Sequence, residues 1–121
     1  MKVVDIENIK IPSINNKYGY NPKSGKLYLN GPYREFKKLL VRHCADISIA
    51  SPYSVSIFVE GYLDIDNAIK VTLDAIQEKG VIDDDKNVLE QNIIKVPAKR
   101  GAPGSIAVYV DPIKKYIDKI K

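Results

Sequence analysis

Two aspartates separated by one residue lie in the stretch of sequence best suited to chemistry. Asp64 and Asp66 leave a predicted strand in extended chain, so their carboxylates share one side. Lys70 follows Asp66 by four residues, which makes the two side chains neighbours at a helix start. A third carboxylate, from Asp84 or Asp85, is expected to join them. Three carboxylates would then converge beside one ammonium group.

This convergence depends on how far the chain can return. A helix over residues 66–79 is about 20 Å long at about 1.5 Å per residue. Residues 80–85 span at most about 17 Å when extended. If the chain doubles back along its helix, Asp84 or Asp85 comes close to Asp66.

The donor set of such a cluster favours a hard cation. Carboxylates packed this closely repel one another, so a bound cation is needed to stabilise them. Oxygen ligands without His or Cys favour Mg²⁺, with Mn²⁺ as a substitute, over zinc. A cation held in this way keeps waters that can be activated and accepts phosphate oxygens. Lys70 is placed to neutralise charge that develops on a phosphodiester. The pattern therefore indicates metal-dependent phosphodiester hydrolysis.

The same residues suit other interpretations less well, or leave them open. A calcium-binding EF-hand loop that starts at Asp64 would need Gly at Ile69 and Glu at Ala75, so it fails on spacing. A nucleotide phosphatase is disfavoured because no Gly-rich phosphate-binding loop is present. Three purely structural roles stay open: Asp66 as a helix cap, Lys70 and Asp74 as a surface ion pair, and residues 83–85 as a turn.

The periodicity of the chain predicts the elements that position these residues. Strands are expected over residues 3–11, 53–60, 88–96 and 105–110, and helices from Gly31 and over 66–79. The order β-α-β-α-β-β predicts an α+β single domain with a mixed sheet. Residues 15–25 are expected to form a polar loop. Asp111 and Pro112 are expected to start a short C-terminal helix whose inner side chains are Ile113, Tyr116, Ile117 and Ile120.

Both central helices have an apolar face. The first is expected to bury Tyr33, Phe36, Leu40, His43 and Cys44. The second is expected to begin with Asp66 or Asn67 as its cap, to end at Gly80, and to bury Ala68, Ile69, Leu73 and Ile76. His43 is expected to be a packing residue and Cys44 an inert buried thiol, since neither has the partner that a nucleophile and its base require.

Composition bounds the class of protein. The chain has 121 residues, 45% of them hydrophobic, with one cysteine and a net charge of +4. No apolar run approaches the roughly 18 residues of a membrane helix, so a cytoplasmic protein with no membrane partner is expected. Residues 64–85 carry −5 and the rest of the chain +9. This distribution suits a polyanion binder that holds a cation at one point, although a solvated acidic helix face gives the same pattern.

The spaced motif of this region resembles a known family. Asp64-Ile65-Asp66-Asn67 with Lys70 and Asp74, followed by Gly80-Val81-Ile82 and Asp84-Asp85-Lys86-Asn87-Val88, is similar to the RusA family of Holliday junction resolvases. The resemblance extends to Lys95 and, more loosely, to residues 12–33. It implies a Mg²⁺-dependent endonuclease that acts as a homodimer on four-way junction DNA, without an organic cofactor. By this likeness Asp64, Asp66 and Asp85 are the catalytic metal ligands, with Asp84 as the fallback for Asp85, and Lys70 is the essential lysine.

Such an enzyme must also hold the DNA backbone. A two-fold dimer would present two matching sites to two strands of like polarity. Phosphate contacts should dominate its affinity. The candidate DNA-binding residues are Lys17, Lys23, Lys26, Arg34, Lys37, Lys38, Lys99 and Arg100, of which the loop containing Lys99 and Arg100 is favoured. A non-catalytic junction-binding protein of the same fold is the alternative.

Overall fold

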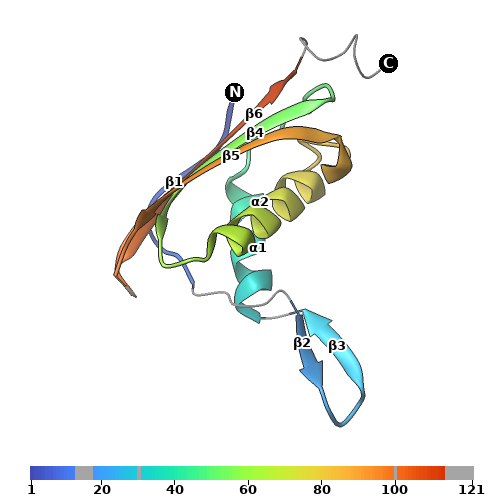
Figure 1. Cartoon of the computed structure of the whole chain (residues 1–121), viewed down its shortest axis with the longest axis vertical. Coiled ribbons are helices and arrows are strands. Elements are labelled where there is room, and N and C mark those ends of the chain that lie inside the picture. The colour runs from blue at the N-terminus through green and yellow to red at the C-terminus, as the bar shows by residue number, and fades with distance from the viewer. Residues whose placement is uncertain (13–17, 30, 100, 114–121) are drawn as a thin grey trace.

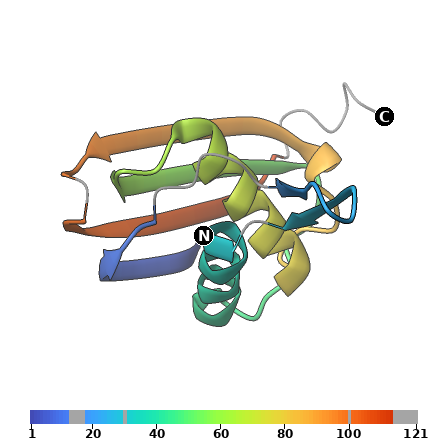
Figure 2. The same cartoon turned by 90° about the horizontal axis from the view of Figure 1, so that it is seen from below.

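The computed structural model describes residues 1–12, 18–29, 31–99 and 101–113. Four strands form one sheet in the order β1-β6-β4-β5: β1 (Lys2–Lys10), β4 (Tyr53–Gly61), β5 (Val88–Pro97) and β6 (Pro103–Pro112). The helices α1 (Gly31–His43) and α2 (Ile65–Lys79) cover one face of this sheet (Figures 1 and 2). The predicted α+β fold, with the order β-α-β-α-β-β and a mixed sheet, is confirmed.

The strand directions decide where the ends of α2 lie. β4 is antiparallel to β6 but parallel to β5, with Tyr53 opposite Val88 and Gly61 opposite Pro97. Two parallel neighbours run the same way, so the chain must travel back along the sheet between them. Helix α2 is this crossover connection between β4 and β5 (Figure 1). It therefore begins beside the end of β4 and finishes beside the starts of β4 and β5.

Alternation along the strands and helical spacing on α1 and α2 create the core between them. Val55, Ile57 and Val59 of β4 are at most 3% exposed and point toward the helices. The helices bury matching side chains against them, namely Tyr33, Phe36 and Leu40 of α1 and Ala68, Val71, Leu73, Ala75 and Ile76 of α2. The predicted inner faces are thus confirmed, apart from Ile69, which is only partly buried, and His43.

The end of α1 differs from the prediction. His43 is exposed, because the helix ends at this residue and its side chain turns to solvent. Cys44, one residue further, is buried as expected, and desolvation raises the pKa of its thiol. The thiolate is therefore disfavoured, which agrees with an inert packing role.

Two further segments depart from the sequence prediction. The expected polar loop contains part of a hairpin, β2 (Tyr18–Asn21) and β3 (Lys26–Leu29), which extends away from the sheet (Figure 1). The C-terminal helix does not start at Asp111, since Asp111 and Pro112 are the last residues of β6 and still pair with β4. Ile113 is buried as expected, whereas the remainder of that predicted helix, residues 114–121, lies outside the described residues.

Within the described ranges, no helix combines the length and the apolar character needed to cross a bilayer.

Candidate active site

Asp64 and Asp66 lie at the exposed N-terminus of α2. The chain leaves β4 at Gly61, and the fully buried side chain of Leu63 anchors the turn that follows. Asp64 then takes an extended backbone (φ −63°, ψ 140°), and its Oδ1 accepts a hydrogen bond from the Asp66 N–H at 3.1 Å. Asp64 is thus the N-cap of α2, and the prediction of Asp66 or Asn67 as the cap was wrong. The local sequence does not decide between Asp64, Asp66 and Asn67, since Asp and Asn are both favourable N-cap residues.

The helix itself makes this end favourable for negative charge. Asp66 occupies the first turn of α2, where the unpaired N–H groups and the helix dipole stabilise a carboxylate. Asp64 and Asp66 are both exposed. Their mutual repulsion is therefore offset in part before any cation is bound. Two accessible carboxylates at a helix N-terminus suit a hard cation that keeps several of its waters, which is the usual mode of Mg²⁺.

Lys70 lies one helical turn beyond Asp66 and is exposed. Within the described ranges it takes part in none of the ion pairs. The expected alternative, a Lys70–Asp74 surface pair, is not formed, because the Asp74 carboxylate accepts a hydrogen bond from the Tyr33 hydroxyl. That bond joins α1 to the middle of α2. It was missed in the sequence, where Tyr33 was assigned only to the apolar face of α1.

Asp85 lies at the opposite end of α2. It opens the short 3₁₀ helix η1 (Asp85–Asn87), and its backbone N–H donates to Oε1 of Gln77 at 3.1 Å. Gln77 follows Asp66 by eleven residues, which is about 16 Å along the helix axis. The predicted doubling back of residues 80–85 along α2 is wrong within one chain. Those residues are used instead to start β5 at the far edge of the sheet, as its parallel pairing with β4 requires.

The two acidic neighbours of Asp85 build the turn that precedes β5. Asp84 caps η1 by accepting the Lys86 N–H at 3.0 Å. Asp83 accepts a hydrogen bond from Nδ2 of Asn87 at 3.0 Å, and this bond lowers the pKa of its carboxyl group. Its N–H donates to the Tyr53 hydroxyl at 3.1 Å. Asp83 and Asp84 therefore stabilise the turn before β5, which is the structural role left open in the sequence.

The described residues contain no group of three or more His, Cys, Asp or Glu side chains close enough to hold a metal ion. One chain thus offers the pair Asp64 and Asp66 at one end of α2 and Asp85 at the other. The side chain of Asp85 is exposed, and in the described part of the molecule its carboxylate is engaged in neither a hydrogen bond nor an ion pair.

The comparison with protein families bears directly on this region. Residues 60–109 match the family model of endodeoxyribonuclease RusA. The matched segment runs from the end of β4 through α2 and β5 into β6, so it contains Asp64, Asp66, Lys70 and Asp85. The resemblance stated from the sequence is confirmed over these residues. No curated protein matches the chain.

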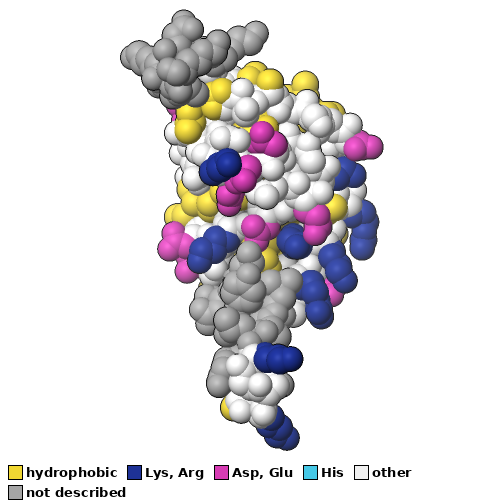
Figure 3. All heavy atoms as spheres, turned by 90° about the vertical axis from the view of Figure 1, so that its right-hand side faces the viewer, with side chains coloured by type: hydrophobic (Ala, Val, Ile, Leu, Met, Phe, Trp, Pro, Cys, Tyr) yellow, Lys and Arg dark blue, Asp and Glu magenta, His cyan; other side chains and the backbone are white. Residues whose placement is uncertain are grey.

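The candidate DNA-binding residues lie mostly outside the segment that matches RusA. Lys23 and Lys26 are exposed at the β2–β3 hairpin, and Arg34 and Lys38 are exposed on α1. Figure 3 views the molecule from the right-hand side of Figure 1, and it shows Lys and Arg side chains on the hairpin and along one edge of the surface in view. Lys99, within the RusA segment, is exposed between β5 and β6. Lys17 and Arg100 lie outside the described residues.

Some of these cations already have acidic neighbours. Lys37 is partly buried, and its Nζ lies 3.3 Å from Oε1 of Glu78 on α2. Glu35 lies 3.9 Å from Arg34 and 4.0 Å from Lys38, with all three side chains more than half exposed. Exposed pairs of this kind contribute little and are easily exchanged for another anion. Arg34 and Lys38 are thus better placed than Lys37 to contact phosphate.

Proposed function

We propose that this chain is a Mg²⁺-dependent endonuclease that resolves four-way DNA junctions as a homodimer. The observation that carries the proposal is the exposed set Asp64, Asp66 and Lys70 on the first turns of α2, inside the segment that matches RusA. The residue types suit phosphodiester hydrolysis, and the family match names that class of reaction. The substrate, the cation and the assembly are parts of the proposal.

Asp64 and Asp66 hold the cation in this mechanism. The cap bond to the Asp66 N–H uses one oxygen of Asp64 and fixes the orientation of its carboxylate. Mg²⁺, when bound, supplies an activated water as nucleophile and a counter-charge for the phosphate. Lys70, one turn away on the same helix, donates hydrogen bonds to a non-bridging phosphate oxygen as negative charge builds there. The helix N-terminus adds a fixed positive field at the same place.

A dimer reconciles the metal ligands with the geometry of one chain. If two α2 helices pack antiparallel about a two-fold axis through their middles, the N-terminus of each lies beside the C-terminus of the other. The Asp64–Asp66 pair of one subunit then meets Asp85 of the partner subunit. Asp85 is exposed, which such a contribution requires. Each catalytic site would thus be shared, and the dimer would carry two of them.

The surface beside α2 supports this arrangement. Ile65 at the start of α2 is 42% exposed, and Leu89 near the start of β5 is 49% exposed, so each end offers an apolar side chain. β5 is an edge strand of the sheet, with one side of its backbone unpaired within the described sheet. An antiparallel pairing would bring Ile65 of one subunit toward Leu89 of the partner subunit. Burial of such side chains favours association.

The alternative function is a junction-binding protein of the same fold that does not cut. The separation of Asp85 from Asp64 and Asp66 within one chain favours it, because the described residues of one subunit bring no third carboxylate to that pair. The two proposals share the DNA-binding surface. They differ in whether phosphodiester bonds are broken.

One assay distinguishes these proposals. The purified protein is incubated with a synthetic four-way junction, and in parallel with a linear duplex of the same sequence, with and without Mg²⁺. An endonuclease of the proposed kind gives paired symmetric nicks in the junction only, and only with Mg²⁺. The matched variant Asp66→Asn should lose cleavage and retain junction binding in a mobility-shift experiment. Junction binding by the unaltered protein without any nicking would establish the non-catalytic alternative.

A further inference from the structure

Lys95 of β5 is a cation on the side of the sheet where apolar side chains are expected. It pairs with Val59 of β4, which is 2% exposed and belongs to the core beneath the helices. Ile93, two residues earlier on the same side of β5, packs against this core as well. Lys95 is partly buried, whereas its apolar neighbours Ile94 and Val96 are 54% and 50% exposed on the opposite face. The usual alternation of buried apolar and exposed polar residues is therefore reversed at this end of β5.

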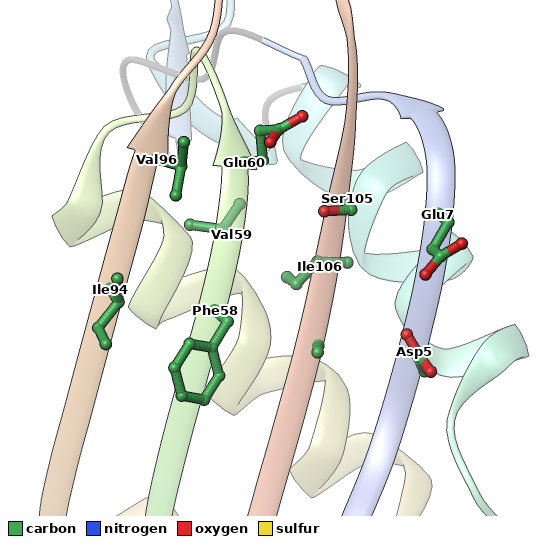
Figure 4. Close-up of a pocket in the computed structure, with 10 residues that line it drawn as sticks. Asp5, Glu7, Phe58, Val59, Glu60, Ile94, Val96, Ser105 and Ile106 are labelled. Carbon is green, nitrogen blue, oxygen red and sulfur yellow. The ribbon is translucent and has the colours of Figure 1, made fainter.

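The first turns of α2 lie over this part of β5. Figure 4 looks onto the sheet from the side away from the helices, and α2 passes behind β5 at the level of Ile94 and Val96. The contacts between α2 and β5 agree with this arrangement. Lys95 lies between Ile94 and Val96 in the strand and points to the other side, so it faces the first turns of the helix. Those turns carry Asp66 and Lys70.

The flank of α2 that faces β5 adjoins Asp66. The other flank contacts α1, where the Tyr33 hydroxyl donates a hydrogen bond to Asp74. Ile69 is turned about 140° away from Asp74 at about 100° per residue, and it is partly buried against the core. Asp66 precedes Ile69 by three residues, so the two side chains are neighbours on the helix surface. Lys95 is therefore on the side of α2 that leads to the candidate active site.

Lys95 has no acidic partner there. In the described part of the molecule it takes part in none of the ion pairs. Partial burial of a charge is costly unless an opposite charge compensates it, and proteins retain such departures from their patterning mainly at functional sites. Lys95 is also inside the segment that matches RusA, but no role has been given to it so far.

We propose that Lys95 is a substrate-positioning residue, whose ammonium group binds a backbone phosphate of the strand that is cut, next to the scissile phosphate. The inference rests on the proposed nuclease function and adds a second lysine to Lys70. Lys70 acts on charge that develops during the reaction, whereas Lys95 holds the strand in place before it. Loss of Lys95 should therefore weaken binding of the junction.

The salt dependence of junction binding tests this role. Lys95→Met keeps an apolar stem over the core and removes the ammonium group. Binding is measured by mobility shift without Mg²⁺ over a range of salt concentrations. Loss of one phosphate contact should lower the slope of log affinity against log salt by about 0.9 and weaken binding about tenfold at about 0.1 M salt. Lys95→Arg, which keeps the charge, should retain the slope. Lys10→Met, at an exposed lysine at the end of β1 and outside the RusA segment, is the matched control and should change neither quantity.

A modified junction then places the contact at the active site. The cleavage position is mapped with Mg²⁺, and a neutral methylphosphonate replaces each of the two phosphates that flank it in turn. One of these replacements should weaken binding by the unaltered protein and have no further effect on Lys95→Met. Additive losses at both positions would overturn the proposed position of Lys95.

The other outcomes separate this inference from the proposed function. Cleavage by the unaltered protein, with the same affinity and slope in Lys95→Met, would overturn the inference and leave the nuclease function intact. A melting temperature of Lys95→Met lower by more than about 3 °C with the slope retained would assign Lys95 to packing and overturn it as well. So would dissociation of the Lys95→Met dimer in light scattering, which would assign Lys95 to the subunit interface. Absence of junction binding by the unaltered protein would refute the proposed function itself, and this inference with it.

Discussion

Asp66 and Asp85 lie at opposite ends of α2, because the Asp85 N–H is bonded to Gln77, which follows Asp66 by eleven residues or about 16 Å along the helix axis. A hydrolytic site that uses both carboxylates cannot therefore be completed by one chain. Their separation is a consequence of the parallel pairing of β4 with β5. A metal site that contains both Asp66 and Asp85 therefore requires two subunits.

A mixture of two inactive variants should recover activity if the site is shared. Asp66→Asn and Asp85→Asn homodimers each lack one ligand in both sites. In a mixed dimer, one site carries both lesions and the other is intact, so random exchange restores about a quarter of the wild-type sites. The measurement is junction nicking after the two proteins are denatured, mixed and refolded. Mixed dimers should give single nicks, because paired cleavage needs two intact sites.

The control for this mixture uses two lesions from the same end of α2. Asp66→Asn mixed with Asp64→Asn leaves no intact site in any dimer, so nicking should stay absent. If the Asp66→Asn and Asp85→Asn mixture is equally inactive while each variant still binds the junction, Asp85 does not act across the dimer.

The helices and strands could be predicted from the sequence far better than the distance between Asp85 and the pair Asp64 and Asp66. Alternating Val55, Ile57 and Val59 and the αL residue Gly80 (φ +88°) are local signals, and both were interpreted correctly. The position of Asp85 depends on strand direction instead. A mixed sheet in which the strands before and after α2 are parallel places residues 64–66 and 83–85 at opposite ends, so a mixed sheet of this order and a single-chain cluster are incompatible.

The β2–β3 hairpin was missed for a related reason. Each strand has only four residues, and the intervening stretch is rich in Pro, Lys, Ser and Gly. Such composition signals a turn, but the pairing of short flanking strands depends on cross-strand contacts that no local pattern records. The cap of α2 was likewise ambiguous, because Asp64, Asp66 and Asn67 all have suitable side chains.

The double role of Asp64 can be separated by two substitutions. Asp64→Ser keeps an oxygen that accepts the Asp66 N–H but removes the carboxylate, so stability should stay within about 0.5 kcal/mol of the parent while cleavage is lost. Asp64→Ala removes the cap as well and should cost about 1 kcal/mol in the free energy of unfolding. Urea unfolding measures the free energy of unfolding of both variants, and a junction-cleavage assay measures their activity. Full cleavage by Asp64→Ser would exclude Asp64 as a metal ligand.

Lys70→Ala should slow cleavage without destabilising the fold. Lys70 is exposed and in the described ranges forms no ion pair, so the melting temperature should change by less than about 3 °C. Loss of a donor that faces developing phosphate charge should lower the single-turnover rate about 100-fold. Lys10→Ala, which removes an exposed lysine at the end of β1, outside the segment that matches RusA, is the matched control. An unchanged rate for Lys70→Ala would remove Lys70 from the mechanism.

The turn before β5 should respond to pH through Asp83. The hydrogen bond from Asn87 lowers the pKa of the Asp83 carboxyl below its ordinary value of 3.8. The folded state thus binds this proton less readily than the unfolded state, so the contribution of this bond is present above about pH 4 and is lost as pH falls through the lowered pKa. Asn87→Ala should move the pKa of Asp83 upward, toward 3.8, in an NMR titration of the carboxyl carbons. A pKa of Asp83 that does not rise in Asn87→Ala would mean that backbone donors, rather than Asn87, hold the carboxylate in this turn.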